Sequence, residues 1–466
     1  MTARSDRRSL LLRQLRTTLP TAPAPAGGER AEAPLTGAQS GLWVIDQLDP
    51  GSSQYTVPIA YRLHGHLDLD ALDRALAAVV ARQEALRAVF DADDDEPVQR
   101  FQGPTAPLRV VDLSTRPGPD RDRELREVLR SGSEQSFDLA SGPLLRVTAV
   151  RLTADEHVLL VVTHHIVFDG WSVGVFLREL GACYQAELTG QPVDLPALGG
   201  TFGDYARWHQ EWLAGEECRR TRDHWLTRLA DLPAPVDLAT KPRQPYAATP
   251  GTPVPVGVDA TTATALDETC RRAQVTPFMV LLAAFAVVLS RRTGATDLLI
   301  GSPMANRPLP YTRHLIGYFV NLVVLRVDLG GDPTLGELLG RVRDVAVEAY
   351  EHQHYPFPEL VDHLEPHRDT TVPPMVPVTF VLQDAEREGT ADWPGLRIEV
   401  EELPVDGTVS DLTVSLAPGP DGLRGEITYR ADICDRADIE DLASAFTRAV
   451  RKFAGDLDRR IDSLDV

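Results

Sequence analysis

Residues 163–172 read THHIVFDGWS and come directly after an apolar run at residues 157–162. The run predicts a short buried β-strand, and residues 173–188 predict a helix that Ser172 can cap. The two histidines and Asp169 therefore fall on a strand-to-helix turn. A histidine and a carboxylate at such a turn make acid–base chemistry the first hypothesis.

The histidine pair carries the predicted chemistry. Successive side chains on an extended backbone point to opposite faces, so only one of His164 and His165 can face a given cavity. We predict that His165 is the reactive residue and that His164 faces the structure. Asp169 either orients an imidazole directly or holds the turn through an arginine. Gly170 leaves a wall without a side chain, where a slender substrate can approach. These four residues form the predicted catalytic set.

Other interpretations of the turn remain open. The pair can be a satisfied structural pair with no catalytic role. A metal site is a second alternative, because histidine and aspartate are ligand types. Adjacent histidines on a strand diverge, however, and no further His/Cys cluster with zinc spacing lies nearby, so no metal is predicted. A Ser-His-Asp hydrolase is the least favoured alternative.

Composition limits the class of protein. A chain of 466 residues is too long for one ordinary core and predicts two domains. No apolar run is long enough to span a membrane, and the N-terminus lacks the features of a secretory signal. The four cysteines are widely scattered, which favours a reducing cytoplasm over a disulfide framework. The formal charge of −21 argues against nucleic acid as a partner. We therefore expect a cytoplasmic protein with neither nucleic acid nor a membrane as partner.

The chain divides by pattern into three parts. Residues 1–34 predict a flexible leader or a docking segment, because a basic stretch precedes a linker rich in Pro, Ala and Gly. Residues 35–190 and 191–466 predict an N-terminal and a C-terminal α/β lobe, joined near residues 190–250. The second lobe contains no histidine pair, so one active site is expected, in the cleft between the lobes. The predicted strands are residues 55–63, 87–90, 145–152, 298–302 and 319–327, and the predicted helices are residues 69–83, 202–229, 261–273 and 278–292.

Seven segments, in order along the chain, resemble the motifs of the condensation domains of nonribosomal peptide synthetases, which are similar to chloramphenicol acetyltransferase. The resemblance runs from about Leu35 to the C-terminus. One such match is weak evidence, but seven in the correct order are strong evidence. The segments are TGAQSGLW (36–43), RQEALRAVF (82–90), HHIVFDG (164–170), DYARW (204–208), IGYFVN (316–321), HQHYPF (352–357) and RD (368–369).

Four positions depart from the motifs of that family. Gly41 replaces an arginine, as in some condensation domains that accept unusual acyl donors, including chain-initiating ones. Gln83 stands in place of a histidine, His354 in place of an aspartate, and Val372 in place of an arginine. None of these changes touches the histidine pair. They bear on the substrate and on peripheral ion pairs, and they leave the reaction class unchanged.

The resemblance implies two chloramphenicol-acetyltransferase-like α/β lobes in a V-shaped pseudo-dimer, with the active site in a tunnel between them. It also implies that a donor acyl group arrives as a thioester on the phosphopantetheine arm of an acyl or peptidyl carrier protein. The acceptor is then an amine or a hydroxyl, on a second carrier protein or on a free small molecule. The chain itself is expected to bind no cofactor. His165 would accept the nucleophile's proton or position the nucleophile, and alignment of both substrates can supply much of the rate.

Supporting roles are expected for residues outside the turn. Asp169 is expected to pair with an arginine, for which Arg87 and Arg326 are the candidates. Trp208 is predicted to belong to the core more than to a substrate contact. Asn321 is predicted to face the cleft, because a polar residue in an apolar strand needs a partner.

Two other functions are weighed against condensation. A coenzyme A-dependent acyltransferase of the same superfamily would share HxxxDG, but its DFGWG motif is absent. A catalytically inactive recruitment domain would bind partner enzymes, but such domains usually lose the histidine pair, which this chain keeps. No adenylation or carrier region follows the motifs, which predicts a free-standing enzyme or an excised first domain. The predicted function is therefore amide or ester formation from a carrier-bound thioester, in natural-product biosynthesis.

Overall fold

The computed structural model describes residues 30–93, 96–105, 107–242, 251–365, 375–383, 393–401, 403 and 410–465. Residues 1–29 of the predicted leader lie outside the described residues. The RD motif at residues 368–369 and Val372 also lie outside them.

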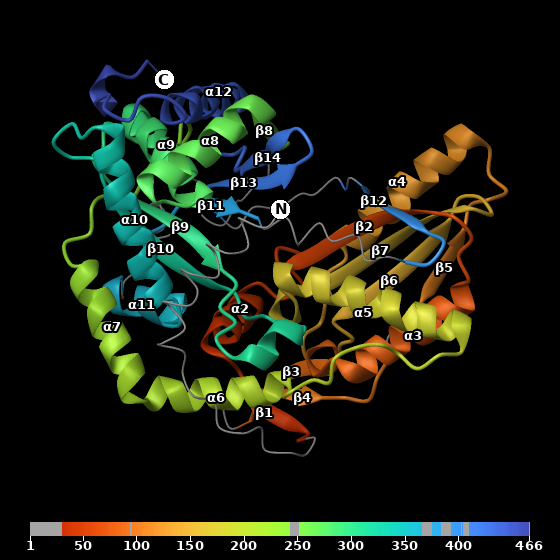
Figure 1. Cartoon of the computed structure of the whole chain (residues 1–466). Coiled ribbons are helices and arrows are strands. Elements are labelled where there is room, and N and C mark those ends of the chain that lie inside the picture. Colours follow the sequence, from red (N-terminus) through yellow and green to blue (C-terminus); the bar gives the residue numbers. More distant parts are fainter. Residues whose placement is uncertain are drawn as a thin grey trace. The chain divides into compact units, whose positions relative to one another are not determined.

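The chain forms two compact units, each built of helices and β-sheet (Figure 1). This confirms the predicted α/β class with two lobes. The division differs from the predicted boundary at residue 190, because unit 1 extends to Glu217 and includes two later segments. The first crossing between the units falls within the predicted joint at residues 190–250. Unit 1 consists of Met1–Glu217, Ala305–Val320 and Arg387–Val405, and unit 2 of Cys218–Met304, Asn321–Glu386 and Asp406–Val466.

The described residues of unit 1 form a five-stranded sheet, in the order β12-β2-β7-β6-β5, and a three-stranded sheet, in the order β1-β4-β3. Strand β7 lies in the middle of the larger sheet, and its residues from His157 to His164 are all buried. A continuous apolar run is typical of a strand that is covered on both faces. The strands are β1 (Glu32–Pro34), β2 (Thr56–His64), β3 (Ala88–Asp93), β4 (Glu96–Phe101), β5 (Arg109–Asp112), β6 (Leu145–Arg151), β7 (Glu156–His164) and β12 (Arg397–Glu401).

Helices α3, α4 and α5 contribute to one core with the larger sheet. Figure 1 shows α3 and α5 side by side along this sheet, and α4 packs against β2 and β7. Asp68 caps α3, since its Oδ1 accepts a hydrogen bond from the Ala71 amide at 2.9 Å. The helices are α2 (Gly37–Leu48), α3 (Leu69–Arg82), α4 (Gly118–Glu134), α5 (Gly170–Thr189) and α6 (Phe202–Ala214).

In the described part of unit 2, a six-stranded sheet has the order β10-β9-β11-β13-β14-β8. Helix α9 is buried from Val280 to Leu289 and packs against α10 and α12. The strands are β8 (Val254–Asp259), β9 (Asp297–Met304), β10 (Asn321–Asp328), β11 (Val378–Leu382), β13 (Leu412–Gly419) and β14 (Gly422–Tyr429). The helices are α7 (Glu216–Arg228), α8 (Ala260–Ala273), α9 (Pro277–Thr293), α10 (Leu335–Glu351), α11 (Phe357–Leu364) and α12 (Arg436–Phe453).

Among the described residues, no single helix has both the length and the apolar composition needed to cross a membrane. Helices α8 and α9 meet that test only as a pair, and the pair is bent by 102° at its break.

Candidate active site

The predicted turn begins where β7 ends. A short 3₁₀ turn at His165–Val167 follows the strand, and α5 begins at Gly170. Asp169 caps this helix, because its Oδ1 accepts hydrogen bonds from the Ser172 amide and the Ser172 hydroxyl, both at 2.8 Å. The prediction that Ser172 caps the helix is therefore wrong by three residues. Asp169 has the extended backbone of an N-cap residue (φ −118°, ψ 175°), whereas Ser172 already lies inside the helix.

His165 is held by its backbone and by one ring nitrogen. Its amide donates to the Tyr55 carbonyl at 2.8 Å. Its Nδ1 lies 2.6 Å from the Phe168 carbonyl oxygen, and a carbonyl can only accept, so Nδ1 carries a proton. In the neutral imidazole, Nε2 is then the proton-accepting atom. The His165 side chain is partly exposed, as a reactive base must be.

His164 points into the structure. It is only 3% exposed, and its Nδ1 accepts a hydrogen bond from the Ile166 amide at 3.1 Å. Burial, and secondarily the neighbouring His165, lower the pKa of His164 from 6.5 to about 4. The ring is therefore neutral at pH 7 and serves to fix the turn. The predicted divergence of the two histidines is confirmed.

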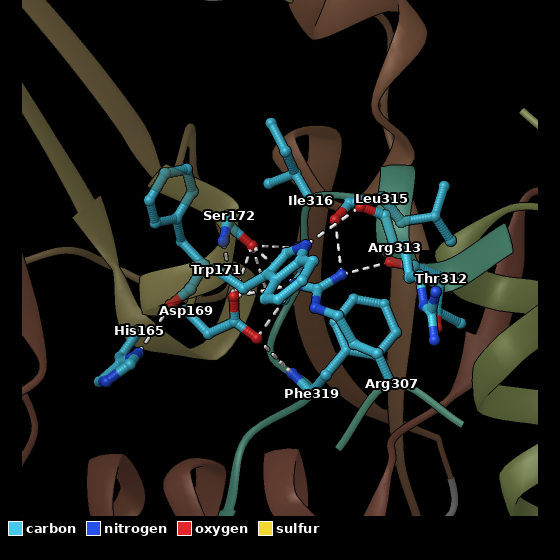
Figure 2. A network of polar contacts seen from close by, with 12 residues as sticks. His165, Asp169, Trp171, Ser172, Arg307, Thr312, Arg313, Leu315, Ile316 and Phe319 are labelled. Atoms are coloured by element: carbon cyan, nitrogen blue, oxygen red, sulfur yellow. Dashed lines mark hydrogen bonds and ion pairs between the residues drawn. The ribbon is translucent and has the colours of Figure 1, made fainter. Parts of the chain in front are cut away.

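Asp169 forms a buried ion pair with Arg307. Arg307 Nη2 lies 2.9 Å from Oδ1 and 3.1 Å from Oδ2 of Asp169, and the two side chains are 3% and 0% exposed. The Phe319 amide also donates to Oδ2, at 3.1 Å. Figure 2 shows the carboxylate directed toward this network and His165 pointing away from it. Asp169 is thus a structural residue, as the resemblance implied, and does not orient the His165 ring.

The two arginines predicted to pair with Asp169 are elsewhere. Arg87 Nη1 donates to the Gln102 carbonyl at 3.0 Å, and Arg326 pairs with Asp297 at 2.8 Å within unit 2. The prediction failed because Arg307 belongs to none of the seven motifs. Only its position in the loop before IGYFVN distinguishes Arg307 in the sequence.

Arg307 belongs to the segment Ala305–Val320, which is part of unit 1 although β9 and β10 on either side of it belong to unit 2. Arg307 also donates to the carbonyls of Thr312 and Leu315, and its guanidinium lies 4.0 Å from the centre of the Phe319 ring. The Trp171 indole donates to the Arg313 carbonyl at 3.0 Å (Figure 2). Side chains of the segment and side chains of the histidine turn therefore hold the two together.

Gln83 holds the same segment from the end of α3. It is 1% exposed, its Nε2 donates to Glu179 Oε2 at 2.9 Å and to the His314 carbonyl at 3.0 Å, and its Oε1 accepts from the Ile316 amide at 2.9 Å. One neutral amide group thus both donates and accepts. Gln83, which stands in place of the family's histidine, therefore makes contacts with Glu179 and with residues 314 and 316 that the sequence did not predict.

Residues 170–174 read GWSVG, which fits the Gly-x-Ser-x-Gly pattern of a hydrolase nucleophile elbow. That pattern requires an exposed serine hydroxyl. Ser172 is fully buried, its Oγ bonds to Asp169, and the same Oγ accepts from the Gly317 amide at 3.1 Å. The serine therefore joins the turn to the segment, and the hydrolase alternative is excluded.

The remaining predicted residues have structural contacts. Asn321 is buried in unit 2, where its Nδ2 donates to the carbonyls of Gln353 and Tyr355 and its Oδ1 accepts from the Phe357 amide. The predicted need for a partner is confirmed, but backbone groups of unit 2 supply it. The prediction that Asn321 faces a cleft is wrong, because the side chain is only 4% exposed. Trp208 is buried in unit 1 and stacks on Tyr205, as predicted for a core residue.

Unit 1 thus contains the four residues of the predicted catalytic set, together with Ser172. Arg326 and Asn321 lie in unit 2. No group of three or more His, Cys, Asp or Glu residues in the described part of the chain is arranged to hold a metal ion.

A partly exposed neutral imidazole at the end of a central strand can accept a proton near pH 7. A family model for the condensation domain matches residues 29–466. The chain therefore belongs to the condensation domain family, whose general activity is acyl transfer by condensation.

Known proteins with similar sequences and structures agree with this assignment. The malpinin synthetase from Mortierella alpina is 38% identical over 88% of this chain, which spans only 5% of the length of that synthetase. The X-domain from teicoplanin biosynthesis is 29% identical with a TM-score of 0.83, over 95% of this chain and 100% of that chain. The first condensation domain of the calcium-dependent antibiotic synthetase has the same fold, with 22% identity and a TM-score of 0.78 over 94% and 100% of the two chains. The chain is thus similar to a small part of a much larger synthetase.

Proposed function

We propose that the chain joins an acyl or aminoacyl group, carried as a thioester on a carrier protein, to an amine or hydroxyl acceptor. The observation that carries this proposal is the geometry of His165. Its Nδ1 is committed to the Phe168 carbonyl, so the neutral ring presents Nε2 as a base on a partly exposed side chain. A neutral imidazole can accept a proton near pH 7.

The bond changes follow from this arrangement. The acceptor nitrogen or oxygen attacks the thioester carbonyl carbon, and its proton passes to Nε2 of His165. The carbon–sulfur bond then breaks, and the thiolate of the phosphopantetheine arm takes up the proton. In this proposal the partner carrier protein supplies the arm, the acceptor is a second carrier protein or a free small molecule, and the chain binds no cofactor of its own.

The test is a condensation assay with an acyl-loaded donor carrier protein and a panel of amines and alcohols. Intact-protein mass spectrometry measures the loss of the acyl group from the carrier, with parallel detection of the product. We expect His165→Ala to lower the rate by at least about 100-fold, because general bases contribute that much or more. His64→Ala is the matched control, since His64 lies at the opposite end of β2 from the turn and pairs with Glu399. Full activity of His165→Ala would remove the base role.

Recruitment of a partner enzyme is a second candidate function. It is favoured by the likeness to the X-domain, for which a structure of the complex with OxyB from teicoplanin biosynthesis is known. The wild-type chain would then form no product with any acceptor in the panel, yet would bind a partner enzyme saturably in calorimetry. His165→Ala would leave that binding unchanged.

A further inference from the structure

The ring of Tyr318 lies against the His165 imidazole. The ring centres are 5.0 Å apart and the planes meet at 64°, which is an edge-to-face contact. Both side chains are partly exposed, whereas Gly317 and Phe319 on either side of Tyr318 are buried. Tyr318 therefore lies beside the proposed base, on the segment that packs against the turn.

The backbone around Tyr318 is fixed by side chains. The Ile316 amide donates to Gln83 at 2.9 Å, the Gly317 amide donates to Ser172 at 3.1 Å, and the Phe319 amide donates to Asp169 at 3.1 Å. These three acceptors are all buried. The position of the Tyr318 backbone relative to the histidine turn is therefore set by three hydrogen bonds to residues outside the segment.

His165 is held at two places. Its Nδ1 bonds to the Phe168 carbonyl, and its ring lies edge-to-face against the ring of Tyr318. The contact with Tyr318 limits rotation of the imidazole and so helps to set the direction of Nε2. Packing that locks the rotamer of a reactive side chain is the usual way to keep it in productive geometry.

We propose that Tyr318 is a positioning residue whose aromatic ring holds the His165 imidazole in the orientation that condensation requires. This inference rests on the proposed function. The role belongs to the ring and not to the hydroxyl. Burial, and after it Tyr55 and Asp169, raise the pKa of the Tyr318 hydroxyl, so Tyr318 stays neutral at pH 7 and brings no charge to His165.

Two variants separate the ring from the hydroxyl. Tyr318→Phe keeps the ring, and we expect its kcat to stay within about twofold of the wild type. Tyr318→Leu removes the ring, and we expect its kcat to fall about tenfold with an unchanged KM for the loaded donor carrier. The acid limb of its pH profile should move to higher pH, because water that enters beside the imidazole stabilises the protonated ring. Tyr311→Phe is the matched control, since Tyr311 lies on the same segment and packs against Gly200.

A second readout does not depend on turnover. Diethyl pyrocarbonate modifies accessible neutral imidazoles, and peptide mass mapping gives the rate at His165 separately from that at His164. We expect the rate at His165 to rise several-fold in Tyr318→Leu and to stay unchanged in Tyr318→Phe and Tyr311→Phe. An unchanged kcat and modification rate in Tyr318→Leu would overturn the proposal, as would an equal loss of kcat in Tyr318→Phe. A wild-type chain that forms no product would instead count against the proposed function, while the modification rates would still test the role of Tyr318.

Discussion

The Asp169 carboxylate accepts hydrogen bonds at both oxygens, from the Ser172 amide and hydroxyl, the Phe319 amide and the Arg307 guanidinium. Such a group has little capacity left for substrate chemistry. A buried ion pair of this kind is costly to break from one side, because the remaining charge is left without a partner in the interior. The pair is therefore one of the contacts that hold the segment against the turn.

We predict that Asp169→Asn destabilises this part of unit 1 by about 3–5 kcal/mol, because the buried Arg307 loses its counter-charge. Hydrogen exchange with mass spectrometry should show at least about 100-fold faster exchange in peptides that cover residues 163–175 and 314–320. Asp297→Asn is the control. It breaks the Arg326 pair, whose side chains are 19% and 34% exposed, and should cost about 1 kcal/mol or less. Equal effects of the two substitutions would contradict the structural role of Asp169.

At the scale of elements, the periodicity of the sequence predicts strands and helices well where a segment packs along its whole length. Strand β7 and helices α3 and α9 were predicted within two residues of their ends. The predicted helix at residues 202–229 is two helices, because the helix is interrupted at Gly215, whose amide bonds to the Trp212 carbonyl. Both halves are helical in composition, so periodicity alone could not reveal the break.

Helix α5 has a glycine where an aromatic ring approaches. An added Cβ at Gly181 would lie 2.7 Å from Trp393 Nε1, and Trp393 is 3% exposed. Gly340 lies inside α10 with no atom within 4 Å of an added Cβ. Substitution by alanine favours the helix by about 1 kcal/mol at either site. The difference between the two variants therefore isolates the contact with Trp393.

We predict that Gly340→Ala stabilises α10 by up to about 1 kcal/mol. We expect the effect of Gly181→Ala on stability to be about 1–3 kcal/mol less favourable than that of Gly340→Ala, because the Trp393 ring must move. Hydrogen exchange in peptides from α5 and α10 measures both effects in the same experiment. A gain in protection of α5 in Gly181→Ala as large as that of α10 in Gly340→Ala would show that the ring moves without cost.

At the scale of the whole molecule, the two α/β lobes could be predicted from the sequence, and so could the position of the histidine turn at the end of β7. The partner of Asp169 could not be predicted, because Arg307 lies 138 residues away and approaches only through the fold. The contacts of Gln83 with the segment and of Tyr318 with His165 could not be predicted for the same reason. Contacts of this kind depend on which segment joins which unit, and local sequence patterns do not predict that assignment.

Both units contain a histidine whose pKa burial lowers to about 4, His164 in unit 1 and His354 in unit 2. An unfolded histidine binds its proton near pH 6.5, so below that pH the unfolded chain takes up protons that the folded chain does not. The contribution of these two histidines to folding stability is therefore complete above pH 6.5 and is lost as the pH falls toward 4.

We predict that His164 alone removes about 2 kcal/mol of stability between pH 7 and pH 5. The variant His164→Asn keeps an acceptor for the Ile166 amide and does not titrate, so its urea unfolding curves at the two pH values should lie closer together than those of the wild type. His64→Asn, at the far end of β2, serves as control and should retain the wild-type difference. An unchanged pH dependence in His164→Asn would assign the acid sensitivity to other groups.

The segment that carries Arg307 has a practical consequence for dissecting or recombining the chain. A fragment that stops at Glu217 would contain the histidine turn, but Asp169 would lose its ion pair with Arg307. A chimaera that exchanges residues 1–217 with a relative would place the turn of one parent against the segment of the other. Exchange boundaries should therefore keep residues 305–320 and the turn from the same parent.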